Sequence, residues 1–303
     1  MKLVQRIALR YFRTKFSLLA AISKKKAAEK AFELFCTPQS RNKKALPKIF
    51  EQADPLSFRL DGVMVKGWRW IPESGELPAT GKKAMICHGF ESSVINFDRY
   101  IKPLLKKGYE VLAFDAPAHG RSGGKQINAP LYKKMILEVN KRYGPVHSFM
   151  AHSFGGLGLS LALEEISHTP AHKLVLIAPA TETKTAADTF FHFLQLDPAI
   201  RTEFDRLIIQ RSGLSIDWYS IRRAMRNIKA TVLWVHDEDD DITPLADALK
   251  IKDDGHPHVE FLITKGLGHR RIYRENKVTK AIIDFYSPLT THYSLLSGKS
   301  FCK

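Results

Sequence analysis

The segment that most constrains this chain covers residues 149–165 and reads FMAHSFGGLGLSLALEE. A short apolar stretch ends at Ala151, and Ser153 stands two residues later. Two glycines follow, Gly155 and Gly156, and the spacing of an amphipathic helix begins at once. This order predicts a strand, a very tight turn and a helix, with Ser153 at the apex of the turn. The glycines remove side chains that would collide where the helix doubles back along the strand.

The predicted turn gives Ser153 an unusual environment. A serine at such an apex has a strained backbone and a raised hydroxyl, with the positive end of a helix dipole beneath it. A serine held in this way usually acts as a nucleophile. The sequence of the turn alone leaves open a second interpretation, in which Ser-Phe-Gly-Gly only starts a helix.

Two later segments favour the first interpretation. Residues 231–244 read TVLWVHDEDDDITP, which indicates a buried strand that opens into a loop of carboxylates. Residues 259–272 read VEFLITKGLGHRRI, which indicates a strand followed by the glycine-flanked His269. The chain therefore presents a serine, an acid and a histidine in that order, each at the exit of a predicted strand.

Positive charge is concentrated near the start of the chain. The 303 residues carry a net charge of +16, and residues 1–50 contribute +11 of it, with 13 Lys and Arg against two acidic residues. A globular nucleic-acid-binding face is not needed to explain this balance. The hydrophobic content of 44% and the charged content of 26% are ordinary for a soluble globular protein long enough to bury a substantial core.

The first residues of this basic arm, residues 1–50, have the pattern of an amphipathic helix. Cations occupy one side of the helical wheel and apolar residues the other, interrupted by Lys15. The cations are Lys2, Arg6, Arg10 and Arg13, and the apolar residues are Leu3, Val4, Ile7, Ala8, Tyr11, Phe12 and Leu18. This pattern suits a helix lying on an anionic membrane, and it equally suits a helix whose apolar face packs on the protein's own core.

Cysteine and histidine usage bears on location and cofactors. Cys36, Cys87 and Cys302 are odd in number and widely spaced, so we expect free thiols in a reducing compartment. The arm lacks both an apolar run of the roughly 18 residues that a membrane span needs and a signal-peptide pattern. We therefore expect a cytoplasmic protein, with peripheral contact at the inner membrane face through the arm. The twelve histidines form no HExxH-like cluster, so neither a metal site nor a cofactor is expected.

Strand and helix signals alternate along most of the chain. Residues 56–71 have the pattern of a hairpin, and the runs that follow indicate parallel strands covered by helices on both faces. Between residues 181 and 229 only helical patterns occur, which predicts a cap over Ser153, or else an elaborated crossover without a lid role. We therefore expect an arm (1–50), a core (51–180 and 231–286), a helical cap insertion (181–230) and a polar tail (287–303).

Four motifs of this chain resemble those of the α/β-hydrolase superfamily, in particular its capped, monoglyceride-lipase-like or esterase-like members. HGFESS (88–93) is similar to the oxyanion loop, and DAPAHGRSGG (115–124) matches the loop Asp-x-x-x-His-Gly-x-Ser-x-Gly. AHSFG (151–155) takes the nucleophile position, and HDEDDDITP with GLGH supplies an acid and a base. The resemblance covers roughly residues 55–286. It implies an α/β-hydrolase fold, with a mostly parallel central sheet, helices on both faces and a small helical cap.

The resemblance also implies roles for individual residues. Ser153 would be the nucleophile, His269 its base and Asp240 the acid that orients the histidine. The backbone N–H groups of Phe90 and Phe154 would stabilise the oxyanion.

The acidic loop contains five consecutive carboxylates, so the choice of acid depends on register. Aligning the family's His-Gly-x-x-Asp-x-x-Val-Pro on His236 and Pro244 selects Asp240, with Asp239 as the alternative. Asp237 then replaces the usual glycine, and we expect most of the other acids to be solvated.

These expectations lead to a serine hydrolase that cleaves a carboxylic ester or thioester of a small-molecule acyl substrate through an acyl-enzyme. Two alternatives remain open: hydrolysis of another acyl bond, amide or carbon–carbon, and a non-catalytic ligand-binding protein that docks at a membrane through its arm. The fold by itself does not decide among them. We expect His88 and His119 to organise their loops, and His152 to point into neighbouring structure.

Overall fold

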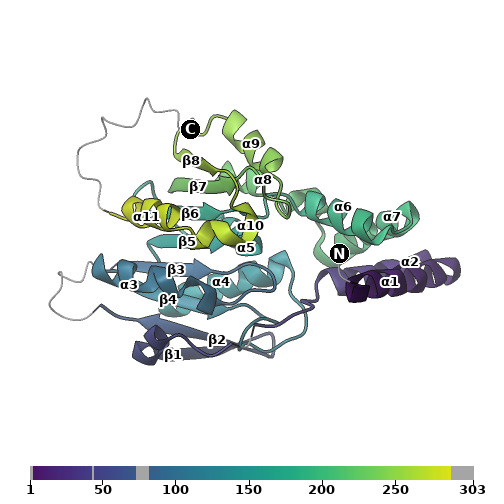
Figure 1. The fold of residues 1–303 in the computed structure, drawn as a ribbon, viewed down its shortest axis with the longest axis horizontal. Helices are drawn as coiled ribbons and strands as arrows, with labels where there is room; N and C mark the ends of the chain where they lie inside the picture. The colour runs from purple at the N-terminus through teal and green to yellow at the C-terminus, as the bar shows by residue number, and fades with distance from the viewer. Residues whose placement is uncertain (1–2, 43, 73–81, 288–303) are drawn as a thin grey trace.

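The computed structural model describes residues 3–42, 44–72 and 82–287, and an eight-stranded sheet lies at its centre (Figure 1). The strand order is β1-β2-β4-β3-β5-β6-β7-β8. β2 runs antiparallel to both of its neighbours, and all other pairs are parallel. The strands are β1 (Asp54–Leu60), β2 (Val63–Trp70), β3 (Lys83–Cys87), β4 (Glu110–Asp115), β5 (Ser148–His152), β6 (Lys173–Ile177), β7 (Thr231–Asp237) and β8 (Val259–Thr264).

The local sequence explains both kinds of strand. The central strands come from near-continuous apolar runs, and their residues are almost all buried because helices cover both faces. The hairpin of β1 and β2 turns at Asp61 and Gly62, which both have positive φ, as a two-residue hairpin turn requires. The predicted mostly parallel α/β sheet is confirmed.

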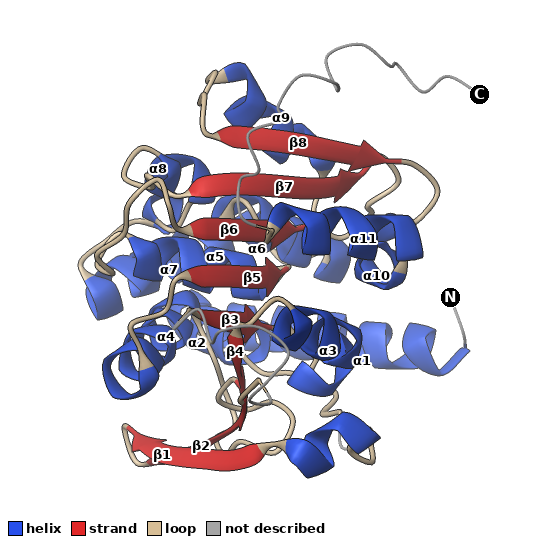
Figure 2. Ribbon diagram, turned by 90° about the vertical axis from the view of Figure 1, so that its left-hand side faces the viewer, coloured by secondary structure: helices blue, strands red, loops and turns tan. Residues whose placement is uncertain are grey.

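Helices cover the two faces of the sheet, and each face has its own buried apolar cluster (Figure 2). One face carries α3 (Asp98–Lys106) and α11 (Asn276–Phe285). The other carries α4 (Ala129–Tyr143), α5 (Phe154–Leu163), α8 (Ile221–Met225) and α9 (Leu245–Asp253). The shorter helices are α10 (Gly268–Arg271) and the 3₁₀ turns η1 (Lys48–Gln52), η2 (Val94–Phe97), η3 (Ile216–Trp218) and η4 (Ile272–Arg274).

A separate layer of four helices lies beyond one end of the sheet, at the right of Figure 1. Two of them, α6 (Thr183–Leu194) and α7 (Pro198–Ser212), belong to the predicted cap insertion between β6 and β7. The other two, α1 (Leu3–Ile22) and α2 (Lys24–Phe35), belong to the arm, and α2 packs along α7 while α1 contacts α6. The arm and the cap insertion therefore form one helical layer. Of the predicted tail, residues 288–303 lie outside the described residues.

Helix α1 divides its apolar residues between two sides. Phe16 is buried and Phe12 is partly buried against the core, whereas Tyr11, Leu18 and Ile22 are 60%, 64% and 80% exposed. The helical wheel had grouped Tyr11, Phe12 and Leu18 on one face. The difference arises because the contact face of α1 is narrower than the apolar arc of its sequence. Within the described part of the chain, no helix is long and apolar enough to cross a membrane.

Candidate active site

Ser153 lies between the end of β5 and the start of α5, at the apex predicted from the sequence. Its φ is +55°, in a region that residues other than glycine adopt only when their surroundings enforce it. A Cβ at position 155 would lie 2.5 Å from the carbonyl oxygen of His88, and a Cβ at 156 would lie 2.6 Å from Cβ of Pro179. The glycines therefore allow α5 to pack closely against the neighbouring loops.

The structure brings Ser153, His269 and Asp240 together from the ends of three different strands. Nε2 of His269 lies 3.0 Å from Oγ of Ser153, and its Nδ1 lies 2.9 Å from Oδ2 of Asp240. Each of the three residues is 7% exposed. Because a carboxylate only accepts hydrogen bonds, Nδ1 carries the proton and Nε2 is left to accept from the serine hydroxyl. Asp239, the alternative acid, is exposed and instead accepts from the backbone N–H of Gly266.

Asp240 is held as a carboxylate by a dense set of donors. Its Oδ1 accepts from the backbone N–H groups of Ile242 and Thr243, and its Oδ2 accepts from the Thr243 hydroxyl as well as from His269. Burial alone would raise the pKa of Asp240, but hydrogen bonds from His269, Thr243 and Ile242 lower it below its ordinary value. The acid therefore remains charged beside the imidazole.

Glu238, Asp239 and Asp241 are exposed, as expected for most of the acidic run, whereas Asp237 is buried. It is fully buried, and its oxygens accept from the backbone N–H groups of Leu267 and Gly268, immediately before His269. It also accepts from the Thr264 hydroxyl at the end of β8. Asp237 therefore ties the loop that carries the acid to the loop that carries the histidine. The only sequence signal for this role of Asp237 is that it stands where the family pattern has glycine.

His152 also contributes to the position of His269. Its Nε2–H donates to the carbonyl oxygen of His269 over 3.1 Å, and the two ring centroids lie 4.7 Å apart. Burial, together with the nearby His269, lowers the pKa of His152 to about 3, so the ring is neutral at physiological pH. His152 thus points into neighbouring structure, as expected.

The two loop histidines make backbone contacts. His88 accepts from the backbone N–H of Ala116, which leaves its Nδ1–H to donate to the carbonyl of Gly89. His119 accepts from the backbone N–H of Glu91, and burial together with the neighbouring His88 lowers its pKa to about 3. Both histidines therefore hold the 88–91 loop in place.

Phe154 and the loop that carries Phe90 lie beside Ser153. The 88–91 loop passes beside the serine, because a Cβ at position 89 would lie 2.8 Å from Cβ of Ser153. Phe154 is the residue after the serine and the first of α5. Within residues 3–42, 44–72 and 82–287, neither amide donates to a protein acceptor. Both N–H groups are therefore available to an oxygen bound next to Ser153.

Comparison with known proteins bears on this arrangement. A family model described as serine aminopeptidase, S33, matches residues 79–202, a range that contains the 88–93 loop, the 115–124 loop and Ser153. The family match and the observed strand order of the sheet both indicate the same fold. The chain has the α/β-hydrolase fold.

Solved structures resemble this chain in fold. The Pyrococcus furiosus esterase Pf2001 superposes with a TM-score of 0.59 at 21% identity, covering 82% of this chain and 96% of that one. Est1E from Butyrivibrio proteoclasticus, solved with ferulic acid, gives a TM-score of 0.58 at 19% identity, covering 76% and 97%. An uncharacterized Bacillus subtilis protein, YqkD, is 25% identical over 248 residues, 76% of this chain and 78% of its own length. These likenesses show the α/β-hydrolase fold, and the family match over residues 79–202 agrees with it.

Proposed function

We propose that this protein is a serine hydrolase that cleaves a carboxylic ester or thioester through an acyl-enzyme. The observation that carries the proposal is the continuous hydrogen-bonded series Ser153–His269–Asp240, with distances of 3.0 Å and 2.9 Å. A serine hydroxyl becomes an effective nucleophile when a neighbouring base accepts its proton, and that base needs an orienting carboxylate on its other nitrogen.

In the acylation step, Oγ of Ser153 attacks the substrate carbonyl carbon while Nε2 of His269 accepts the hydroxyl proton. The imidazolium so formed is stabilised by the Asp240 carboxylate. Negative charge develops on the carbonyl oxygen, where the N–H groups of Phe90 and Phe154 would donate to it. The tetrahedral intermediate then expels the alcohol or thiol, which takes its proton from His269.

Deacylation repeats these roles with water. His269 accepts a proton from water as the water oxygen attacks the acyl carbon, and the second tetrahedral intermediate releases the carboxylic acid and returns the proton to Oγ of Ser153. No group other than water is consumed. Amide and carbon–carbon acyl bonds would use the same residues, so a panel of ester, thioester, amide and diketone substrates ranks the bond types.

The nucleophile is tested by Ser153→Ala. We expect the variant to fold normally and to lose both hydrolysis of an activated ester and covalent labelling by a fluorophosphonate probe, because both need Oγ. Circular dichroism provides the folding control. Labelling that persisted unchanged in the variant would remove Ser153 from the mechanism. If the wild-type protein neither reacts with the probe nor cleaves any substrate in the panel, the result would instead support a non-catalytic ligand-binding protein.

A further inference from the structure

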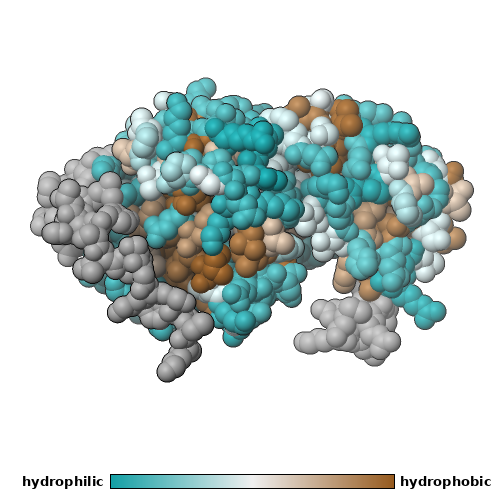
Figure 3. All heavy atoms as spheres, turned by 90° about the horizontal axis from the view of Figure 1, so that it is seen from above, coloured by the Kyte–Doolittle hydropathy of each residue, from teal (hydrophilic) through white to brown (hydrophobic). Residues whose placement is uncertain are grey.

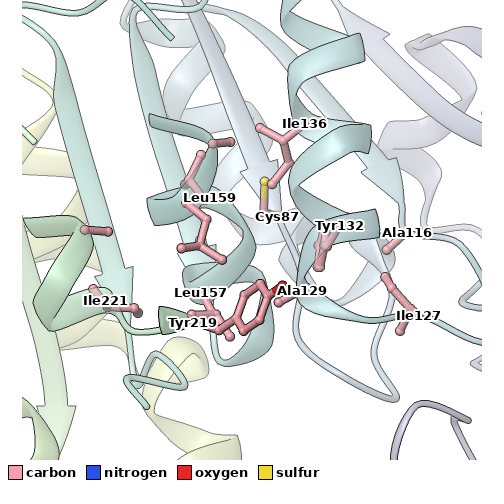
Figure 4. Close-up of a cluster of buried hydrophobic side chains, with 14 of the residues drawn as sticks. Cys87, Ala116, Ile127, Ala129, Tyr132, Ile136, Leu157, Leu159, Tyr219 and Ile221 are labelled. Carbon is pink, nitrogen blue, oxygen red and sulfur yellow. The ribbon is translucent and has the colours of Figure 1, made fainter. Parts of the chain in front are cut away.

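A large apolar cavity of about 920 Å³ opens from Ser153 into the helical layer. Residues of the hydrolase core line it, among them Leu157 of α5 and Ile127 and Ala129 near the start of α4, together with Tyr219 of the cap insertion. Figure 4 shows Tyr219, Leu157 and Ala129 close together. Although lysine and arginine occur at its wall, none of the described residues that line the cavity is an aspartate or a glutamate. Cavities of this size commonly enclose most of the surface of a drug-sized ligand.

Both pairs of helices in the layer contribute to the outer part of this cavity. Phe190 and Leu194 of α6 line one side. Phe12 of α1 and Phe35 of α2 line another, so the basic arm contributes to the same cavity as Ser153. The sequence predicted that the arm either lies on a membrane or packs on the core. Neither prediction anticipated that the arm would line the cavity next to Ser153.

Aromatic contacts fix the arm helices against the cap helices. Phe35 of α2 lies edge-on to Phe190 of α6, with ring centroids 5.3 Å apart, and edge-on to Phe204 of α7 at 5.8 Å. Phe32 contacts the same Phe204 at 5.8 Å. Phe204 is fully buried. Such pairs stabilise a packed interface beyond the area they bury, so this wall is part of the folded structure.

The segment after α2 is attached to the loops around the serine. The backbone N–H groups of Gln39 and Ser40 donate to Glu91, 2.7 Å and 3.2 Å from its Oε1, and Glu91 adjoins Phe90. The Arg41 guanidinium donates to the carbonyls of Ser122 and Gly124 at 3.0 Å and 2.7 Å. The base of the arm is therefore held by the same two loops that surround the site.

We propose that α1 and α2 form the wall that selects the acyl group, and that this enzyme prefers esters with a long apolar acyl chain. The inference rests on the proposed serine hydrolase function. Only the acyl chain stays attached to Ser153 through both chemical steps, so burying it in the cavity stabilises both transition states. Burying one methylene stabilises by about 0.8 kcal/mol, and about 1.36 kcal/mol corresponds to a tenfold change in rate. Each buried methylene should therefore raise kcat/KM about fourfold.

The test is a series of p-nitrophenyl esters, from acetate through butyrate and octanoate to laurate, each below its micelle-forming concentration. For the wild-type protein we expect kcat/KM to rise with acyl length. Phe12→Ala should lower kcat/KM for laurate about 15- to 60-fold, because two or three methylenes lose their contact at about fourfold each, and should affect acetate far less. Leu18→Ala is the control, since Leu18 belongs to the same helix, is 64% exposed and is not among the described residues that line the cavity. It should change kcat/KM for neither ester.

A second variant covers the case in which Phe12→Ala fails to fold. Leu9→Trp adds volume to the same wall and should shorten the preferred chain while retaining acetate hydrolysis. Wild-type kcat/KM that does not depend on acyl length, or variants that change all esters equally, would overturn the inference while leaving the hydrolase function intact. Chain-length dependence found only in acetate esters of longer alcohols would also overturn it. A protein with no esterase activity and no probe labelling would instead refute the proposed function.

Discussion

At the scale of single residues, Thr243 connects the acid and the base. Its hydroxyl lies 2.8 Å from Oδ2 of Asp240 and 3.1 Å from Nδ1 of His269, and its backbone N–H donates to Oδ1 of the same carboxylate. These contacts fix the carboxylate plane before a substrate arrives. Preorganisation of this kind matters because a carboxylate that rotated away would leave the imidazole free to adopt the wrong tautomer.

The register of the acidic loop can be tested with a matched pair of variants. Asp240→Asn should lower kcat about 10³- to 10⁴-fold, because the amide cannot hold His269 in the tautomer that accepts the serine proton. Asp239→Asn should change kcat by less than about threefold, since the Asp239 side chain is exposed and accepts from the backbone N–H of Gly266, away from His269. Steady-state kinetics on one activated ester compares the two. A larger loss in Asp239→Asn would shift the proposed acid by one residue.

The three proposed catalytic residues could be selected from the sequence because each follows a recognisable strand and carries a distinctive local motif. Thr243 and His152 could not be assigned their contacts in this way. Thr243 stands between Ile242 and Pro244 after the acidic run, and its contact with His269 spans 26 positions. Such contacts depend on how two loops close over each other, which local patterns do not encode.

At the scale of elements, Asp237 joins the exits of β7 and β8. Burial alone would raise its pKa, but hydrogen bonds from Thr264, Gly268 and Leu267 lower it. A carboxyl group whose pKa is lower in the folded state stabilises the fold above its unfolded pKa, about 3.9 for aspartate. This contribution is lost as pH falls from that value toward the lower folded pKa.

Asp237→Asn should therefore destabilise the protein at neutral pH by about 1–3 kcal/mol, because a charged acceptor of buried backbone donors is replaced by a neutral one. The difference from wild type should narrow as the pH falls below about 4, where the wild-type carboxylate also becomes protonated. Thermal melts at a series of pH values measure both effects. Glu238→Gln on the exposed side of the same loop is the control. A difference in melting temperature that stayed constant with pH would contradict this account.

Strands were predicted more reliably than the placement of helices. The buried strands come from compact β-branched and apolar runs, so their positions follow from the sequence, as does the Asp61–Gly62 hairpin turn. The amphipathic pattern of α1 predicted a helix but not its partner. Its contact face could meet a membrane, the sheet or the cap, and only the folded arrangement places Phe12 in the cavity.

At the scale of the whole molecule, two segments far apart in sequence form one functional layer. Lys24 of the arm pairs with Asp197 of the cap, and Arg13 donates to the carbonyl of Phe193 at 3.0 Å. Because the arm lines the cavity, deleting it would remove part of the proposed substrate site as well as any membrane contact. A test of membrane binding therefore needs substitutions on the outward face of α1.

That outward face has the features of a membrane-binding surface. Leu18 and Ile22 are 64% and 80% exposed, Arg10 and Lys15 are also exposed, and α1 contains no acidic residue. Figure 3 shows apolar and hydrophilic atoms mixed on the surface at the right, where the layer of α1, α2, α6 and α7 lies. We expect the protein to bind anionic vesicles through this face, with each cation near the surface contributing about 1 kcal/mol.

The expectation is tested by sedimentation with phosphatidylserine-containing vesicles at low and high salt. The double variant Leu18→Glu, Ile22→Glu should bind several-fold more weakly than wild type, because it removes apolar contact and adds negative charge. High salt should weaken the wild-type interaction, since it screens the cations. Ile71→Glu is the control: Ile71 is 56% exposed and follows β2, away from α1. Acetate hydrolysis by all three proteins serves as the control that the fold and the site are intact. If the double variant binds as well as wild type, or if salt does not change wild-type binding, the outward face of α1 has no membrane role.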